Sequence, residues 1–195
     1  MSEKTYWTSY YEQKDCTSEQ EPSKFARFVK SMLEDNINTV LEVGSGSGRD
    51  AYFLGRFYRV HAIDLACKPK DTPSVTFHQG SMTDITGIHD LLYSRFSLHS
   101  VSEDVEDTVL DFAKGHCSYI AIEARSTNDT LSNDQAINQA ETSYAPAHYR
   151  RYMNLNFMVQ KLSSRGFEIL YAEESDIFAP YKDDNPVCVR IVAKS

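Results

Sequence analysis

The sequence has few cysteines and no long apolar run. Its four cysteines are widely spaced and form no C-x-x-C pair, which argues against both a disulfide framework and a cysteine-based zinc site. No stretch approaches the roughly 18 apolar residues that span a bilayer, and the N-terminal stretch lacks an apolar leader. We therefore expect a soluble, cytoplasmic protein without a membrane partner and without a bound metal.

Basic residues are in the minority, with 20 Lys and Arg against 28 Asp and Glu and a net charge of -8. A surface of this sign repels a phosphate backbone, so nucleic acid is not an expected partner. The 195 residues, of which 41% are hydrophobic, suffice for one sizeable core. We expect an N-terminal arm over residues 1–21 and a single domain over residues 22–195.

Apolar periodicity predicts strands that alternate with helices. Helical patterns follow Pro22, Arg49, Ser102 and Asn154. Strands are predicted near residues 39–43, 58–65, 74–79, 90–95, 118–125, 167–175 and 186–194. The last two strands have no helix between them and must pair as an antiparallel hairpin. The expected fold class is α/β: a Rossmann-like, doubly wound sheet of seven strands, mostly parallel and covered on both faces.

Glycine is also scarce, with 8 residues in all, yet three of them stand at every second position in LEVGSGSGRD, residues 41–50. The apolar run before them is a predicted strand, and a helix begins near Arg49. Glycine permits positive φ and close approach, while a helix N-terminus offers free N–H donors. We interpret Gly44, Gly46 and Gly48 as bare backbone against which a flat or anionic ligand lies, beyond the carboxyl end of the strand.

The spacing of these glycines separates two classes of nucleotide binder. The G-x-G-x-x-G of nicotinamide and flavin enzymes would need glycine at position 49, where Arg49 stands. The E-x-G-x-G-x-G form, which starts at Glu42, resembles the first motif of class I S-adenosylmethionine-dependent methyltransferases, in particular of their small stand-alone members. The resemblance implies that the glycine loop carries the amino-acid end of the cofactor and that Glu42 contacts it, often through water.

Three further stretches resemble the same family in the same order. Asp64 ends the second predicted strand, where a carboxylate can accept hydrogen bonds from ribose hydroxyls, a device that dinucleotide enzymes share. In HQGSMTD, Ser81 stands where the family commonly has an Asp that meets the adenine amine, and Met82 can contact the ring. Ser94 and Arg95 fall beside the methionine portion of the cofactor.

The resemblance therefore implies S-adenosylmethionine as the cofactor. It implies that the residues that hold it are Glu42, Gly44, Ser45, Gly46, Gly48, Asp50, Asp64, Leu65, Ser81, Met82, Ser94, Arg95 and Tyr11. Tyr11 belongs to an aromatic stretch with Trp7 and Tyr10, which resembles the arm that folds over the cofactor in many small members. Packing of these rings into the core is the alternative.

Two candidates for work on the methyl acceptor follow the fourth predicted strand. His99 lies at the carboxyl edge of the sheet, where an imidazole can act as a general base, and a packing or capping histidine is the alternative. Arg95 is a candidate for binding an anion, and an ion pair with Glu123 or Asp90 is the alternative.

A basic and aromatic cluster, HYRRYMN, ends the long polar segment after the fifth predicted strand. His148 and one of Arg150 and Arg151 are candidates for the acceptor pocket, where an arginine holds a carboxylate or phosphate bidentately. A solvated basic patch is the alternative. Phe178, in the loop before the last strand, is a candidate wall of the same pocket, or part of a plain hairpin turn.

Together these observations favour an enzyme that transfers a methyl group from S-adenosylmethionine to a small molecule. The acidic net charge and the basic cluster near His148 favour a small, anionic metabolite or a sugar- or phosphate-bearing precursor. Two other classes stay open: a module that binds S-adenosylmethionine or a nucleotide without turnover, and an NAD(P)-dependent oxidoreductase, against which Arg49 speaks.

Overall fold

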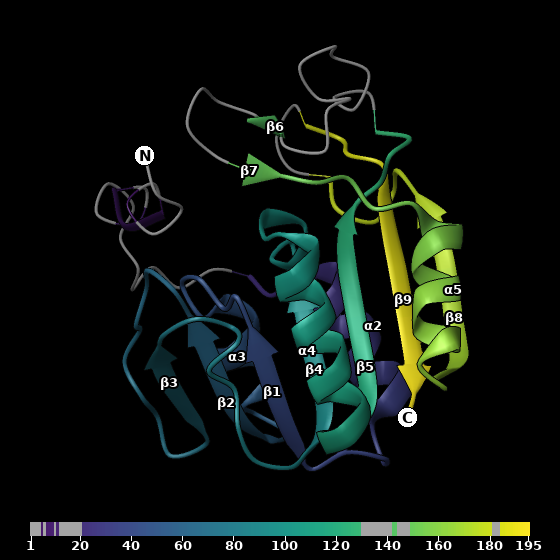
Figure 1. Ribbon diagram of the computed structural model, residues 1–195. Helices are drawn as coiled ribbons and strands as arrows, with labels where there is room; N and C mark the ends of the chain where they lie inside the picture. Colours follow the sequence, from purple (N-terminus) through teal and green to yellow (C-terminus); the bar gives the residue numbers. More distant parts are fainter. Residues whose placement is uncertain are drawn as a thin grey trace.

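The computed structural model describes residues 5, 7–9, 11, 21–129, 142–143, 149–180 and 184–195 (Figure 1). Seven strands form one sheet in the order β3-β2-β1-β4-β5-β9-β8. Their bounds are β1 Thr39–Val43, β2 Arg59–Asp64, β3 Val75–Gln79, β4 His89–Arg95, β5 Cys117–Arg125, β8 Glu168–Ser175 and β9 Cys188–Lys194. A separate pair, β6 Thr142–Ser143 and β7 Tyr149–Arg150, lies above the sheet in Figure 1.

The first five strands pair in parallel, and β9 runs antiparallel to both β5 and β8. The predicted seven-stranded α/β sheet with an antiparallel C-terminal pair is confirmed. The chain proceeds outward from β1 to β3 and then returns to β4 on the other side of β1. This reversal places a switch point between β1 and β4, where ligands bind in open α/β sheets.

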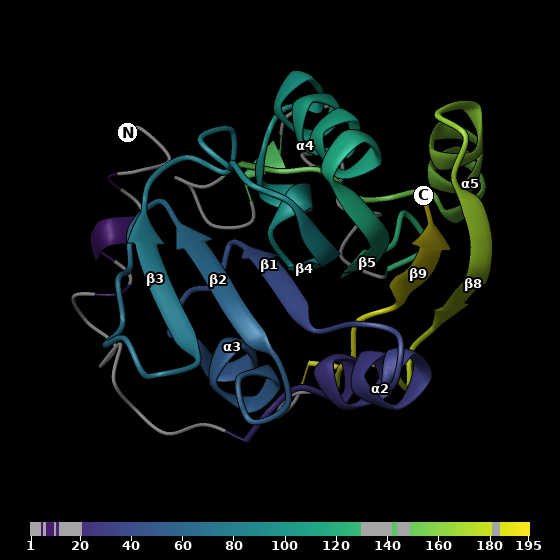
Figure 2. The same cartoon turned by 90° about the horizontal axis from the view of Figure 1, so that it is seen from below.

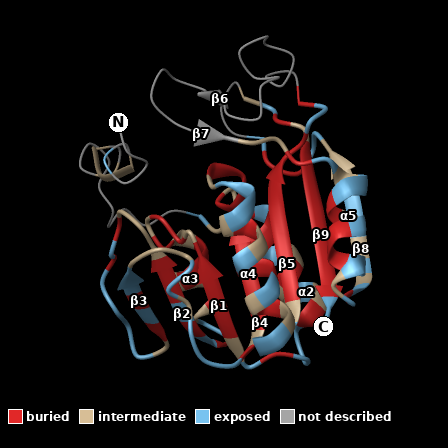
Figure 3. Cartoon of the chain, viewed as in Figure 1, coloured by how far each residue is buried: buried red, intermediate tan, exposed pale blue. Residues whose placement is uncertain are grey.

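The helices form two layers, one on each face of the sheet, as the view from below shows (Figure 2). One layer consists of α2 Lys24–Leu33 and α3 Arg49–Leu54, and the other of α4 Glu103–His116 and α5 Leu155–Ser164. Successive side chains of a strand point to opposite faces, so Val40 packs toward α2 and α3 while Leu41 packs toward α4 and α5. The central strands are accordingly buried along most of their length (Figure 3).

Side-chain caps begin three of the helices. Ser23 accepts a hydrogen bond from Ala26 N and Asn154 accepts one from Phe157 N, both at 3.0 Å, and Ser102 accepts one from Val105 N at 3.5 Å. The helix starts expected after Pro22, at Ser102 and at Asn154 are therefore confirmed. These caps matter for the site because Ser23 and Ser102 both lie beside its cavities.

The expectation that helices cover both faces throughout is wrong at the β3 edge. Residues 65–74 and 80–88, which connect β2 to β3 and β3 to β4, contain no helix. His61 and His78 are consequently exposed on the face that α4 and α5 do not reach. The helix α3 is short: Gly55 ends it, and Phe57, just beyond it, is 51% exposed.

Three of the four cysteines, Cys67, Cys117 and Cys188, are free and buried, as expected. The longest described helix, α4, has 14 residues, and no described helix is long and apolar enough to cross a bilayer. Residues 12–20 lie outside the described part of the chain, as does Tyr10, so the division into an arm and a domain stays a prediction.

Candidate functional site

Two adjoining cavities open at the carboxyl ends of the parallel strands, at the switch point between β1 and β4. Their volumes are about 490 Å³ and about 540 Å³. Gly44, at the end of β1, and Phe96, at the end of β4, line both of them. Trp7 and Tyr11 of the N-terminal stretch also line both. The four residues form a shared boundary, so the two cavities lie side by side.

The first cavity collects predicted residues from the ends of three strands. Those that line it are Gly44, Asp64, Leu65, Ser81 and Met82. Sequence reasoning missed its other wall, which consists of Ile63 and Gly80 together with Ser97, Ser100, Val101, Ser102 and Val105. The part of that wall from Ser97 to Ser102 is the turn between β4 and α4, which includes the short 3-10 helix η1 Leu98–Ser100. Only the packing of α4 against the sheet brings this turn to the cavity.

The carboxylate of Asp64 is fixed at the rim by three backbone donors. Its Oδ2 accepts from Gly46 N at 2.9 Å, and its Oδ1 accepts from Ala66 N at 2.9 Å and Cys67 N at 3.0 Å. A carboxylate has about four acceptor positions, so one of them stays available to a ligand hydroxyl. The side chain is therefore held in place before any ligand arrives.

The second cavity contains a buried carboxyl group with an unused oxygen. Glu42 is 4% exposed, and its Oε2 has no hydrogen-bond partner in the described part of the chain. Burial, and next the charge of Asp50, raise the pKa of Glu42 well above its ordinary value. Ser45 Oγ is likewise buried without a partner. Two polar groups at the head of the glycine loop are thus left for a ligand to satisfy.

Gly44 and Gly46 line the cavities, but the interpretation that a ligand occupies the space left by the missing Cβ atoms needs correction. All three glycines of the loop have positive φ, and the space beside each is filled by the protein itself. A Cβ on Gly44 would overlap Ser97, one on Gly46 would overlap Tyr11, and one on Gly48 would lie 2.6 Å from Phe77 Cζ. The glycines let the loop turn under these side chains, and Gly48 lines neither cavity.

Two other predicted cofactor residues make contacts inside the protein. Asp50 accepts from Ser23 N and Ser23 Oγ, both at 2.7 Å, and from Tyr93 Oη at 2.8 Å, which ties α2 to α3 and β4. Ser94 is fully buried, lies 2.7 Å from Ser97 through the two hydroxyls and lines neither cavity. Asp50 lines the second cavity, but its oxygens are already engaged.

Arg95 forms an ion pair with Glu123, one of the two alternatives to anion binding given above, and its Nε lies 2.7 Å from Oε1. The other oxygen of Glu123 accepts from Arg190 of β9. The alternative partner, Asp90, is excluded: it stands near the opposite end of β4 and accepts from Asn38 N, Thr39 N and Thr39 Oγ1. Arg95 lines the second cavity despite its ion pair.

His99 accepts a hydrogen bond from the backbone of β5. It is 2% exposed, lines the second cavity, and its Nδ1 accepts from Arg125 N at 3.3 Å. A backbone N–H on Nδ1 leaves the ring proton of the neutral imidazole on Nε2. The ring also stacks on Phe96, with 5.5 Å between the centroids. This geometry does not favour the predicted role of His99 as a general base.

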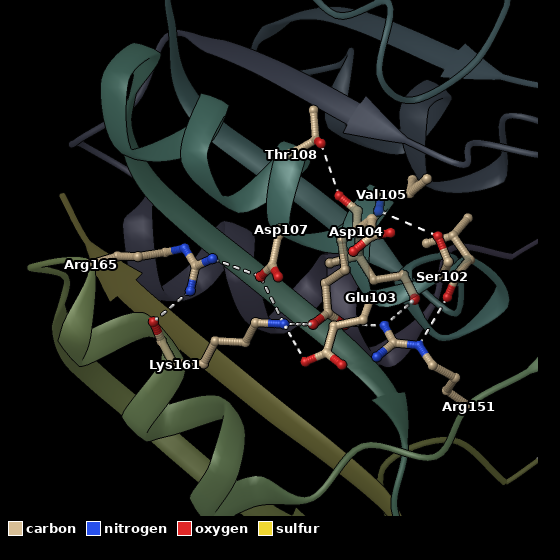
Figure 4. Close-up of polar contacts among 12 residues, drawn as sticks. Ser102, Glu103, Asp104, Val105, Asp107, Thr108, Arg151, Lys161 and Arg165 are labelled. Carbon is tan, nitrogen blue, oxygen red and sulfur yellow. Dashed lines mark hydrogen bonds and ion pairs between the residues drawn. The ribbon is translucent and has the colours of Figure 1, made fainter. Parts of the chain in front are cut away.

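Arg151 points away from both cavities, which corrects its assignment as an acceptor-pocket candidate. Its Nε donates to Val101 O at 2.9 Å, and its Nη2 donates to Glu106 Oε2 at 2.6 Å (Figure 4). Its backbone N donates to His99 O at 2.6 Å. Arg151 therefore clamps the turn that walls the first cavity onto α4. His148 and the side chain of Arg150 lie outside the described residues, so their roles stay predictions.

The clamp belongs to a charged network between α4 and α5 (Figure 4). Lys161 contacts Glu103, Glu106 and Asp107 at 2.7 to 3.2 Å. Arg165 continues the network to Asp107 and Asp111 at 2.6 and 2.7 Å. Glu106, at its centre, is 1% exposed and paired with both Arg151 and Lys161. The network fixes the helix that carries one wall of the cavity.

We expect Arg151→Gln to lower the free energy of unfolding by about 1–3 kcal/mol, because Glu106 loses one of its two cations in a buried setting. Arg165→Gln is the matched control: its partners Asp107 and Asp111 are 36% and 68% exposed, so the loss should be about 0–1 kcal/mol. Urea titrations followed by circular dichroism measure both values. Equal losses in the two variants would contradict the distinction drawn between them.

No protein-family model matches the chain, and no curated protein matches it. Solved structures do resemble it. A 1,6-didemethyltoxoflavin-N1-methyltransferase of Burkholderia thailandensis, with its substrate and S-adenosylhomocysteine bound, has a TM-score of 0.72 and 19% identity over 98% of this chain and 85% of that one. A Listeria monocytogenes protein named as an S-adenosylmethionine-dependent methyltransferase has a TM-score of 0.68 and 19% identity over 88% and 98% of the two chains.

A third similar structure is the [4+2]-cyclase SpnF, with a TM-score of 0.64 and 13% identity over 87% of this chain and 80% of that one. At such identities the likeness concerns the fold. The chain has the fold of class I S-adenosylmethionine-dependent methyltransferases, as the sequence motifs implied. The cyclase shows that this fold also serves another reaction, so the reaction must be argued from the site.

Proposed function

We propose that this protein transfers a methyl group from S-adenosylmethionine to a small molecule. The observation that carries the proposal is the pair of joined cavities at the switch point, one beside the fixed Asp64 carboxylate and the other beside the unpaired Glu42 carboxyl group. The ribose of an adenosyl group needs an acceptor such as the Asp64 carboxylate, and the ammonium of an amino-acid group needs one such as Glu42, in adjoining spaces. Gly44 and Phe96, on the shared boundary, would then flank the sulfur between them.

The residues of the first cavity suit an adenosine. Asp64 keeps an acceptor position for a ribose hydroxyl, and Ser81 offers a hydroxyl at the cavity wall. Ile63, Met82 and Val105 give apolar contact to a flat ring. In the second cavity, Glu42 Oε2 and Ser45 Oγ are the unsatisfied acceptors that an ammonium group would pair with.

The donor supplies an activated methyl group, and the chain supplies alignment. When bound, S-adenosylmethionine would supply the methyl carbon to an electron pair of the acceptor and would keep the S–C pair as a neutral thioether. Holding both reactants in line accounts for most of the acceleration in such a displacement. His99 Nδ1 already accepts a hydrogen bond from Arg125 N, so an acceptor that is already a nucleophilic anion suits the site better than one that must lose a proton.

The second cavity supports a small acceptor. Its volume of about 540 Å³ is within the range of small-molecule sites. Four cationic side chains line it, Lys24, Arg49, Arg95 and Arg125, against three carboxyl groups, Glu42, Asp50 and Asp184, in a chain whose net charge is -8. This small excess of cations supports the small anionic metabolite, or the sugar- or phosphate-bearing precursor, expected from the sequence. A neighbour of the same fold that methylates 1,6-didemethyltoxoflavin offers one example of a small acceptor.

The proposal predicts that Asp64→Asn weakens S-adenosylhomocysteine binding about 10- to 100-fold, through the loss of a charged acceptor for the ribose. Isothermal titration calorimetry measures the dissociation constant. Asp90→Asn is the matched control, because Asp90 also accepts three hydrogen bonds but stands near the amino end of its strand, far from both cavities. That control should leave the dissociation constant unchanged.

The same titration separates the competing functions. Tight binding of NAD with no binding of S-adenosylhomocysteine would contradict the proposal in favour of an oxidoreductase. Tight binding of S-adenosylhomocysteine, together with no transfer of labelled methyl groups to any member of a broad panel of small acids and phosphates, would favour the non-catalytic module.

A further inference from the structure

The Arg95 guanidinium is buried at the second cavity with most of its donors unused. Its side chain is 16% exposed, and its one hydrogen bond within the described chain joins Nε to Glu123. Nη1 and Nη2 thus have no acceptor among the described residues, although they are not sealed from the cavity that Arg95 lines. A guanidinium in this state presents the N–H groups of Nη1 and Nη2 side by side, where they can donate to two oxygens of one anion.

Arg125, in the same cavity, shows the contrasting arrangement. Its Nη1 donates to Asp129 at 2.6 Å and its Nη2 is paired with Asp184, so both ends of its fork are engaged by carboxylates. Burial acts to lower the pKa of Arg95, but Glu123, Tyr93 and Asp50 together raise it above its ordinary value, so the charge of Arg95 persists. The two arginines therefore differ in what they can offer a ligand.

The charges around Arg95 do not balance. Glu123 is its nearest carboxylate, and Glu123 is shared with Arg190, so two cations face one anion in a buried group. The side chains of Glu123 and Arg190 are 0% and 7% exposed, so water screens them little. Among these three side chains one positive charge is left over, at the wall of a cavity that Glu42 and Asp50 also line. Buried charge of this kind is costly unless a counterion pairs with it.

The geometry around Arg95 is rigid. Its guanidinium lies over the ring of Phe96, with 4.3 Å from Cζ to the centroid. Phe96 has a φ of +53°, which non-glycine residues rarely adopt, and its N donates to Glu123 O at 2.8 Å. Strained backbone of this kind gathers at ligand sites, where the surrounding structure maintains it. The stack therefore fixes the plane of the Arg95 guanidinium before a ligand binds.

We propose that Arg95 binds a carboxylate through Nη1 and Nη2, an inference that rests on the proposed function. A single negative charge neutralises the group formed by Arg95, Glu123 and Arg190, whereas a phosphate dianion would leave an excess of negative charge. The two oxygens of a planar carboxylate also match the two donors Nη1 and Nη2 in a bidentate pair. The carboxylate has two possible sources, the methionine end of the donor and the acceptor itself, and the experiment tells them apart.

The experiment compares Arg95→Gln and Arg95→Lys with wild type by calorimetry. The ligands are S-adenosylhomocysteine and 5′-methylthioadenosine, which lacks the amino-acid group. If the donor supplies the carboxylate, Arg95→Gln should weaken S-adenosylhomocysteine binding about 10- to 100-fold and leave 5′-methylthioadenosine binding unchanged. Arg95→Lys keeps the charge but cannot form a bidentate pair, so its affinity for S-adenosylhomocysteine should lie between those of wild type and Arg95→Gln. Unchanged binding of 5′-methylthioadenosine also shows that each variant is folded.

If the acceptor supplies the carboxylate, Arg95→Gln should bind S-adenosylhomocysteine normally. With that ligand saturating, wild type should then bind benzoate or acetate more tightly than inorganic phosphate, and Arg95→Gln should lose this binding. Arg56→Gln, which removes an exposed charge elsewhere, should behave as wild type in both arms.

Three results would overturn the inference. The first is equal binding of every ligand by wild type and Arg95→Gln. The second is a preference of the Arg95 site for phosphate over the carboxylates. The third is a folded wild type that binds neither S-adenosylhomocysteine nor 5′-methylthioadenosine. This result would refute the proposed function itself, and it differs from the first two because wild type then shows no binding of either compound.

Discussion

Glu123→Gln is expected to lower the free energy of unfolding by about 3–5 kcal/mol. The substitution nearly conserves size but removes the charge that two guanidinium groups share. Glu123 is fully buried, and the side chains of Arg95 and Arg190 are 16% and 7% exposed. Without the carboxylate, two like charges would lie together in a region from which water is largely excluded. Urea unfolding followed by circular dichroism measures the loss.

The control for this prediction is Glu168→Gln, on the exposed edge strand β8, which should change the stability by less than about 0.5 kcal/mol. A second variant tests the cause. Adding Arg190→Met to Glu123→Gln removes one of the two stranded charges, so the double variant should lose less stability than the single one. A loss below about 1 kcal/mol in Glu123→Gln would show that the buried charges are not coupled as described.

Glu42→Gln is expected to change how stability depends on pH. Burial raises the pKa of Glu42 well above its ordinary value, so the folded protein keeps this proton at pH values where the unfolded chain releases it. The unfolded state then binds fewer protons, and wild-type stability falls as pH rises from the unfolded pKa toward the raised one. The slope reaches up to about 1.4 kcal/mol per pH unit for one group.

Glutamine cannot ionise, so this contribution should vanish from the variant. The difference between the two stability curves should change by about 1 kcal/mol or more between about pH 5 and about pH 7, in favour of the variant at the higher pH. The comparison uses the slopes, because an amide in this buried position alters the absolute stability as well. Parallel curves would contradict the raised pKa.

Ligand binding gives an independent readout of the same group. If a donor ammonium pairs with Glu42, it favours the carboxylate form, and binding should release a proton from wild type near neutral pH. Calorimetry of S-adenosylhomocysteine in buffers of different ionisation enthalpy measures that proton. Glu42→Gln should release none from this position. Proton release of the same size in both proteins would remove Glu42 from the amino-acid subsite.

The strand and helix pattern could be predicted from the sequence because it depends on neighbours along the chain. Val40, Leu41 and Val43 read as a buried strand, and Ser102 and Asn154 as helix caps, since each signal is local. The uncovered face at β3 could not be predicted in the same way. The expectation of helices on both faces came from the α/β fold class, whereas residues 65–74 and 80–88 cross between strands without a helix.

The first cavity could be predicted in part for a topological reason. The carboxyl ends of parallel strands meet at one edge, so Asp64, Ser81 and Met82, each just past a strand, come together there. The wall from Ser97 to Val105 was missed, because a turn reaches the cavity only when its helix packs on the sheet. Arg125 was missed as well, although its place at the end of β5 was a usable signal.

By itself, the sequence determined the order of the strands along the chain, the glycine turn after β1 and the acidic group that ends β2. The reason is that periodicity, turn residues and spacing act over a few positions. Tertiary structure alone decided which side chains fill the space beside those glycines, where Arg151 points, and that Glu123 is shared by two arginines. Each of these depends on residues far apart in the chain, whose contacts arise only when the layers pack.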